Sequence, residues 1–145
     1  MNPLGAAAAG AAGAHVVGFS VVGVGIDAVD VARYRRVLER TPGIAARTFT
    51  DGELAYARLV ADPTQRLAAR FAAKEAAMKS LGVGLGACRF HDLEVVRAEG
   101  GGPSLVLRGA ALALVAERGV DRLLLSMTHT DLTAQAIVLA VRSAG

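Results

Sequence analysis

Residues 66–86, RLAARFAAKEAAMKSLGVGLG, constrain the fold more than any other stretch of this chain. At about 100° per residue, a helix would place Leu67, Phe71 and Met78 in one apolar stripe, so the pattern predicts a long helix packed on a core. Glu75 lies only roughly 40° from the centre of that stripe. A carboxylate so close to a packed face is unfavourable unless a cation meets it there.

Basic side chains flank this carboxylate. Lys79, one turn later, offers Glu75 a helix salt bridge worth roughly 0.2–0.5 kcal/mol. Arg66, Arg70 and Lys74 repeat every four residues, a spacing at which like charges repel. Such a basic stripe suits a bound anion.

Three glycines, Gly82, Gly84 and Gly86, follow the predicted helix. Their backbone N–H groups can help to hold a phosphate, as they do in other anion-binding turns. The alternative is a helix C-cap followed by a turn, and for Gly82 we favour that alternative.

The composition is that of one globular domain. Of the 145 residues, 53% are hydrophobic but only 4% are aromatic, so the core is built from Ala, Val and Leu and the apolar excess hints at a subunit interface. The net charge of +3 favours anionic ligands or acidic proteins. Nucleic acid is disfavoured as a partner, because no aromatic side chains are interleaved with the basic ones.

Several features predict a cytoplasmic protein. Residues 1–19 are dominated by Ala and Gly, so we expect a disordered leader before a single domain at residues 20–145. A signal peptide would need a basic region, yet the first Arg is Arg33. Cys88 is the only cysteine, which rules out an intramolecular disulfide and a cysteine metal cluster. No apolar run is long enough to span a membrane.

Capping signals divide the first half of the chain into helices. Asp27 follows a Val-rich strand at 20–26 and could cap a helix at 29–40. Thr50 and Glu53 form a capping box that starts a short helix at residue 51. The sequence Asp62-Pro63, with an amide at Gln65, starts the long helix.

The second half favours strands around one further helix. We expect strands at 93–98, 104–108, 122–128 and 133–142, and a helix at 109–118 ended by a glycine. The whole pattern predicts an α+β fold, in which a small antiparallel sheet packs against a long helix and shorter helices.

Two further groups of residues invite a functional interpretation. Arg33, Arg36 and Arg40 share one face of the predicted 29–40 helix, which is either solvated or a dock for an acidic partner. His129 lies at a strand end, but nothing nearby completes a catalytic triad with Ser126, which sits within a strand and not on a nucleophile elbow. A serine hydrolase is therefore disfavoured.

Asp27 and Glu75 suggest a metal site if the long helix packs over the first strand. At about 4 Å two carboxylates repel by roughly 4 kcal/mol at an effective dielectric of 20, so a cation must offset the repulsion. Mg²⁺ is the natural choice, because it binds through one or two carboxylates together with substrate phosphates. Such a site would act on a phosphoanhydride.

Over residues 21–141 the chain resembles the holo-[acyl-carrier-protein] synthases, the short branch of the 4′-phosphopantetheinyl transferase superfamily. The resemblance lies in GVGIDAVDVARY at 23–34, RFAAKEAAMKSLGVG at 70–84, LSMTHT at 125–130 and FTDGE at 49–53. Each block is a modest signal alone, whereas their joint order and spacing are specific.

The resemblance implies transfer of the phosphopantetheine arm of coenzyme A to a serine of an apo acyl carrier protein, with release of adenosine 3′,5′-bisphosphate. It also implies a homotrimer whose sites lie between subunits, and the fold of that superfamily. The residue roles that it implies are magnesium ligation by Asp27 and Glu75, coenzyme A phosphate contacts by Arg70 and Lys79, coenzyme A contacts by the block of Ser126, Thr128 and His129, and a carrier-protein contact by Arg33.

Two alternatives remain open at this stage. Gly23, Gly25 and Ala28 after a strand satisfy the G-x-G-x-x-A pattern of dinucleotide-binding proteins, although a βαβ unit would require a second parallel strand. A basic adaptor that binds carrier protein without catalysis is the other alternative. It would not need Asp27 and Glu75.

Overall fold

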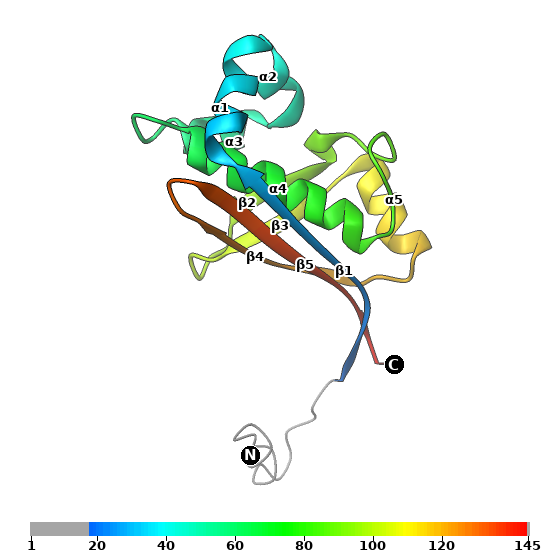
Figure 1. The fold of residues 1–145 in the computed structure, drawn as a ribbon. Coiled ribbons are helices and arrows are strands. Elements are labelled where there is room, and N and C mark those ends of the chain that lie inside the picture. Colours follow the sequence, from blue (N-terminus) through cyan, green and yellow to red (C-terminus); the bar gives the residue numbers. More distant parts are fainter. Residues whose placement is uncertain (1–17, 145) are drawn as a thin grey trace, which may run out of the picture.

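The computed structural model describes residues 18–144 (Figure 1). All but the last two residues of the expected leader lie outside this range, and Phe19 already belongs to the first strand. The elements in chain order are β1 (Phe19–Asp30), α1 (Val31–Arg40), α2 (Ile44–Thr48), α3 (Asp51–Ala57), α4 (Thr64–Ser80), the 3-10 helix η3 (Phe90–Asp92), β2 (Leu93–Arg97), β3 (Pro103–Leu107), α5 (Gly109–Glu117), β4 (Arg122–His129) and β5 (Thr133–Ser143).

Two antiparallel sheets pack around α4, which confirms the predicted α+β fold. One sheet has the order β1-β5-β4 and the other is the β2-β3 hairpin. Helix α4 runs along one face of the three-stranded sheet, and α1, α2 and α3 gather beyond one end of it (Figure 1). No helix in the described part of the chain is long and apolar enough to cross a bilayer.

The part of the core that lies against β1 is built from small side chains, many of them alanines of α4. The buried alanines of this helix are Ala68, Ala69, Ala72, Ala73, Ala76 and Ala77. Because alanine adds little width, the helix can lie very close to β1. Gly23 and Gly25 make the approach closer still, since a Cβ at Gly25 would lie 1.8 Å from the Ala76 carbonyl oxygen and one at Gly23 would lie 1.9 Å from that of Ser80.

The position of these glycines is incompatible with a dinucleotide-binding turn. Gly23, Gly25 and Ala28 all lie within β1, which pairs with β5 in antiparallel register. A dinucleotide site would need a turn at this point and a parallel strand after the next helix. The glycines of β1 instead admit the backbone of α4.

Local capping signals were predicted with mixed success. Both bonds of the Thr50–Glu53 capping box are present. The start predicted for α4 is one residue early, because the helix begins at Thr64 with Pro63 as its N-cap, and Asp62 accepts from the Thr64 backbone N–H at 3.0 Å from outside the helix. Gln65 does not complete that cap, because its amide donates to Asp131 across 2.9 Å. The strand end predicted at Asp27 is wrong, since β1 continues to Asp30, which caps α1 by accepting from the Arg33 N–H at 2.7 Å.

Gly82 ends α4 as a Schellman cap. Its φ is +69°, its N–H donates to the Lys79 carbonyl at 3.0 Å, and the Val83 N–H donates to the Met78 carbonyl at 3.1 Å. The cap interpretation of Gly82 is therefore confirmed. The Gly82 N–H already has a backbone partner, so the predicted phosphate contact of Gly82 is wrong.

Candidate active site

The fold brings Asp27 and Glu75 into one groove. Successive residues of a strand face opposite sides, so Asp27 shares the α4-facing side of β1 with Gly23 and Gly25. Glu75 lies on α4, one turn before Lys79. The groove has a volume of about 380 Å³, and its lining also includes Arg33.

The two carboxylates are close enough to influence each other. Burial raises the pKa of Glu75, the Asp27 carboxylate raises it further, and the Lys79 ammonium lowers it. The spacing of Glu75 and Lys79 along the helix predicted a salt bridge between them. In the structure the ion pair of Lys79 is instead with Asp27. Its Nζ lies 3.1 Å from the Asp27 Oδ1 and donates to the Ile26 carbonyl at 3.0 Å.

The groove fits a hard divalent cation that shares its ligands with a substrate. The described residues contain no cluster of three or more His, Cys, Asp or Glu side chains able to hold a metal. Mg²⁺ needs no such cluster, because one or two carboxylates suffice when waters and substrate phosphates fill the other positions. Asp27 and Glu75, the latter destabilised by its neighbour, are a donor set of this kind.

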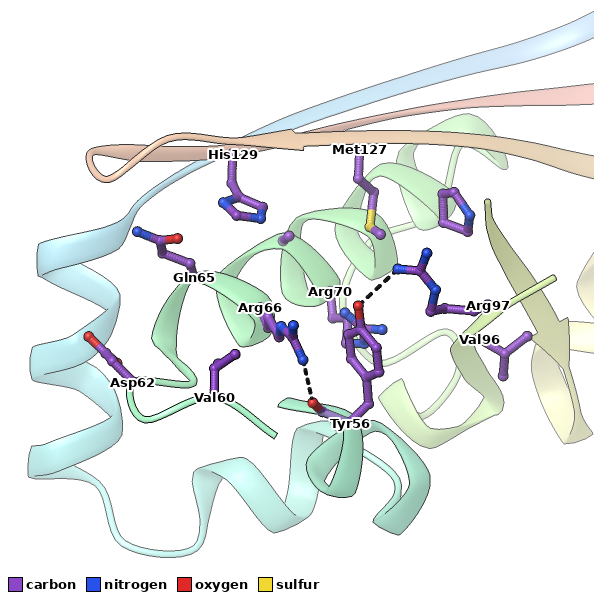
Figure 2. Close-up of a pocket in the computed structure, with 12 residues that line it drawn as sticks. Tyr56, Val60, Asp62, Gln65, Arg66, Arg70, Val96, Arg97, Met127 and His129 are labelled. Atoms are coloured by element: carbon purple, nitrogen blue, oxygen red, sulfur yellow. Dashed lines mark hydrogen bonds between the residues drawn. The ribbon is translucent and has the colours of Figure 1, made fainter. Parts of the chain in front are cut away.

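A second hollow, of about 580 Å³, lies between α3, α4, β2 and β4 (Figure 2). Tyr56 lines it from α3, with the guanidinium groups of Arg66 and Arg70 at 4.4 Å and 4.2 Å from the ring centroid. Arg97 donates to the Tyr56 hydroxyl at 2.9 Å. His129 points into the hollow from β4 (Figure 2).

Three arginines make this hollow suited to an anion. Arg70 is only 5% exposed, and its buried Nε finds no hydrogen-bond partner within residues 18–144. Burial lowers the pKa of Arg70. Burial raises the pKa of Tyr56, but the Arg97 hydrogen bond and the surrounding arginine charges outweigh that effect and leave it lowered. An anionic ligand would supply the acceptor that Arg70 lacks.

Lys74 does not line the arginine hollow, although Arg66 and Arg70 do. The predicted stripe of Arg66, Arg70 and Lys74 is therefore wrong at Lys74. Its side chain is fully buried, with Nζ 2.8 Å from the Glu53 Oε1 and 2.8 Å from the Phe90 carbonyl oxygen. The Val95 N–H donates to the second carboxylate oxygen of Glu53 at 3.1 Å. Lys74 is thus committed to tying α3, α4 and the start of β2 together.

Neither Tyr56 nor Arg97 is predicted from the sequence as a site residue. They come from α3 and β2, and no spacing along the chain links them to Arg70. The stack forms only when three elements meet. The available signal was the basic repeat of Arg66 and Arg70, which marks the correct side of α4.

One chain does not gather all the predicted coenzyme A contacts. Arg70 and His129 share the arginine hollow, whereas Lys79 contacts Asp27 beside the groove of Asp27 and Glu75. Ser126 and Thr128 line a shallow hollow on the face of the three-stranded sheet that α4 does not cover. Ile26 and Ile137 line the same hollow. Gly84 lies in the loop after α4 and has open space where a side chain would stand.

The basic face of α1 is exposed as predicted. Arg33, Arg36 and Arg40 are all exposed. Arg33 differs from the other two because it also lines the groove of Asp27 and Glu75. The basic face therefore begins at the edge of the candidate metal site.

Comparison with known proteins identifies the family. The model of the 4′-phosphopantetheinyl transferase superfamily matches residues 23–136. Holo-[acyl-carrier-protein] synthase of Moorella thermoacetica is 43% identical over 119 residues, covering 82% of this chain and 93% of the relative, and that of Frankia alni is 50% identical over 117 residues, covering 81% and 94%.

A solved structure supports the same assignment. The holo-(acyl-carrier-protein) synthase of Bacillus anthracis, in complex with coenzyme A (3′,5′-ADP), has a TM-score of 0.70 and 30% identity, with 85% of this chain and 98% of that chain covered. The residues matched by the superfamily model, 23–136, include Asp27 and Glu75 and the residues that line the arginine hollow. The chain therefore belongs to the holo-[acyl-carrier-protein] synthase family of the 4′-phosphopantetheinyl transferase superfamily.

Proposed function

We propose that this enzyme transfers the 4′-phosphopantetheine arm of coenzyme A to a serine of an apo acyl carrier protein, in a Mg²⁺-dependent reaction that releases adenosine 3′,5′-bisphosphate. The observation that carries the proposal is the pairing of Asp27 and Glu75 in one groove at the edge of a basic helix. A carrier-binding module without catalysis would not need a partly buried Glu75 whose ionised form is disfavoured by burial and by the neighbouring Asp27.

In the reaction, the serine oxygen forms a bond to the phosphorus next to pantetheine, and the bond from that phosphorus to the bisphosphate leaving group breaks. Mg²⁺, when bound, neutralises the charge that develops on the pyrophosphate oxygens. Asp27 and Glu75 would hold it. The proton of the serine would pass to a metal-bound water, or to Glu75 through a water.

The arginine hollow is the natural place for a phosphate of coenzyme A. Arg66, Arg70 and Arg97 surround Tyr56, and the orphaned Nε of Arg70 needs an acceptor. Arginine is well suited to phosphate because its planar donors bind two oxygens at once. The pocket thus supports the phosphate role predicted for Arg70 and adds Arg66 and Arg97 to it.

The two halves of the site support a homotrimer with shared sites. Asp27 lies on β1 and His129 on β4, which are opposite edges of the same sheet. In a closed ring of heterologous contacts, one edge of each chain meets the other edge of its neighbour. Exposed apolar side chains on the outer face of the sheet, including Val24 at 55% and Ile26 at 61%, offer a surface for such contacts.

The carrier protein would dock on the basic face of α1. Arg33, Arg36 and Arg40 are exposed, and Arg33 also lines the Asp27 groove, so an acidic partner bound to this face would lie beside the two carboxylates. Because exposed charges act mainly on encounter rate and orientation, the KM for the carrier should rise with salt. A cytoplasmic location is part of the proposal, since a chain with one cysteine suits a reducing compartment.

The test is to incubate the protein with coenzyme A, Mg²⁺ and several apo carrier proteins and to weigh the products. We expect a carrier heavier by one phosphopantetheine, loss of the product in EDTA, and recovery with Mg²⁺ or Mn²⁺. Glu75→Gln keeps the shape of the side chain but removes its charge, and should abolish transfer without unfolding the protein. Full transfer in chelator, or by the Glu75 variant, would contradict the metal assignment.

A further inference from the structure

Lys79 occupies a position beside Asp27 that a metal cation would also claim. Its ammonium group is held by two oxygens of β1, the Asp27 Oδ1 at 3.1 Å and the Ile26 carbonyl at 3.0 Å. The side chain reaches these oxygens from α4, one turn after Glu75. The positive charge beside Asp27 is therefore supplied by the chain itself.

The contact is of a reversible kind. The Lys79 side chain is 52% exposed, whereas that of Asp27 is 17% exposed. Ion pairs with so much solvent access are weakly held, and a lysine is a compact charge on a flexible four-carbon stem. Lys79 can therefore leave Asp27 without disturbing the packing of α4. The buried Lys74, one turn and a half earlier, has no such freedom.

Asp27 cannot serve both cations well. Mg²⁺ binds carboxylate oxygens at about 2.0–2.1 Å and requires near-octahedral geometry. An ammonium group that stays within hydrogen-bond distance of the same carboxylate would repel the metal at short range. The metal and the lysine therefore compete for Asp27 in the absence of another anion.

We propose that Lys79 is the resident counter-ion of Asp27 and must leave it before a divalent cation binds, so that the anionic substrate which draws Lys79 away raises the affinity for the metal. This inference rests on the proposed function, because it takes Asp27 and Glu75 as the metal ligands and coenzyme A as the anion. Coupling of this type is reciprocal, so the metal raises the affinity for coenzyme A by the same factor. The free protein then holds metal weakly, and the metal site becomes competent when substrate arrives.

The direct test measures Mn²⁺ binding to the full chain without nucleotide, from the electron paramagnetic resonance signal of free Mn²⁺. We expect Lys79→Met to lower the dissociation constant for Mn²⁺ by about three- to tenfold, because the competing charge is gone while the carboxylates remain. Lys79→Gln, which keeps a polar side chain, should change the constant in the same direction. Arg122→Met is the matched control, since it removes an exposed positive charge at the other end of the sheet and should bind Mn²⁺ as the wild type does.

A second titration, in saturating coenzyme A and corrected for Mn²⁺ bound by coenzyme A alone, tests the coupling. Coenzyme A should tighten Mn²⁺ binding at least threefold more in the wild type than in Lys79→Met. The inference is overturned if Lys79→Met and Lys79→Gln bind Mn²⁺ no more tightly than the wild type while Asp27→Asn binds it far more weakly. In that outcome Asp27 is still a metal ligand, so the metal assignment of the proposed function stands and only the role of Lys79 is refuted. If Asp27→Asn also binds Mn²⁺ as the wild type does, the carboxylate pair is not the metal site, and the proposed function loses its metal assignment together with this inference.

Discussion

The close approach of β1 and α4 makes a sharp prediction about Gly25→Ala. The added Cβ would lie 1.8 Å from the Ala76 carbonyl oxygen and 2.7 Å from the Ser80 backbone nitrogen. Both are backbone atoms of a buried helix, so no side chain can swing aside. Restoring an ordinary contact requires the strand and helix to separate by roughly 1.5 Å. Overpacking of this severity costs about 3 kcal/mol, the upper part of the usual range.

The assay is thermal unfolding followed by circular dichroism, at one fixed protein concentration because assembly would shift the midpoint. A loss of about 3 kcal/mol lowers the midpoint by roughly 10 °C for a domain of this size. Gly100→Ala is the control, since its Cβ would meet nothing within 4 Å, and it should stay within about 0.5 kcal/mol of the wild type. A Gly25→Ala protein as stable as the Gly100 variant would refute the close-packing argument.

Three further predictions concern the charged groups. Lys74→Met strands the buried Glu53 carboxylate and should cost about 3–5 kcal/mol in chemical denaturation. The double variant Glu53→Gln/Lys74→Met should recover part of that loss, because it leaves no unpaired buried charge. If the double variant lost as much stability as Lys74→Met alone, the buried Glu53–Lys74 ion pair would not be the cause of the loss. Folding raises the pKa of Glu75, so the ionised Glu75 side chain lowers the free energy of unfolding at neutral pH. As the pH falls through the raised pKa the side chain is protonated, and this destabilisation disappears. Metal-free Glu75→Gln should therefore melt higher than the wild type at pH 7 and show no advantage at acidic pH; an advantage that persists in acid would rule out ionisation as its cause. Asp27→Ala and His129→Ala should each be inactive alone, whereas co-refolding them at equal ratio should restore about a quarter of the sites if neighbouring chains share them. Mixed trimers that are verified by mass yet remain inactive would disprove sharing.

Features decided within one turn of chain were predictable. The Thr50–Glu53 capping box, the Gly82 cap and the apolar side of α4 each depend on residues a few positions apart, and each is present. The pairing of Asp27 with Glu75 needed one further assumption, that the long helix packs over the first strand. The glycines of β1 make that packing possible, although the sequence suggested a different use for them.

Features decided by partners far along the chain were not predictable from local spacing. Lys74 belongs to the basic stripe by spacing, but α3 and β2 bring Glu53 and the Val95 N–H to it, so its charge is used inside the core. Strand β1 runs to Asp30 because β5 continues to offer pairing positions there, up to Thr133. In both cases a tertiary contact overrode a local preference.

The antiparallel pairing of the outermost strand residues has a practical consequence for engineering. Phe19 and Ser143 are register partners, so the two described ends of the fold emerge side by side (Figure 1). Asp27 lies further along β1, roughly 26 Å away at the rise of an extended strand. A short Gly/Ser linker could therefore join residues 18 and 144, and the chain could be reopened at the exposed turn of residues 100–102, to give a circular permutant in which the groove of Asp27 and Glu75 is undisturbed. For the same reason, an enzyme tethered through this corner would present Asp27 away from the support.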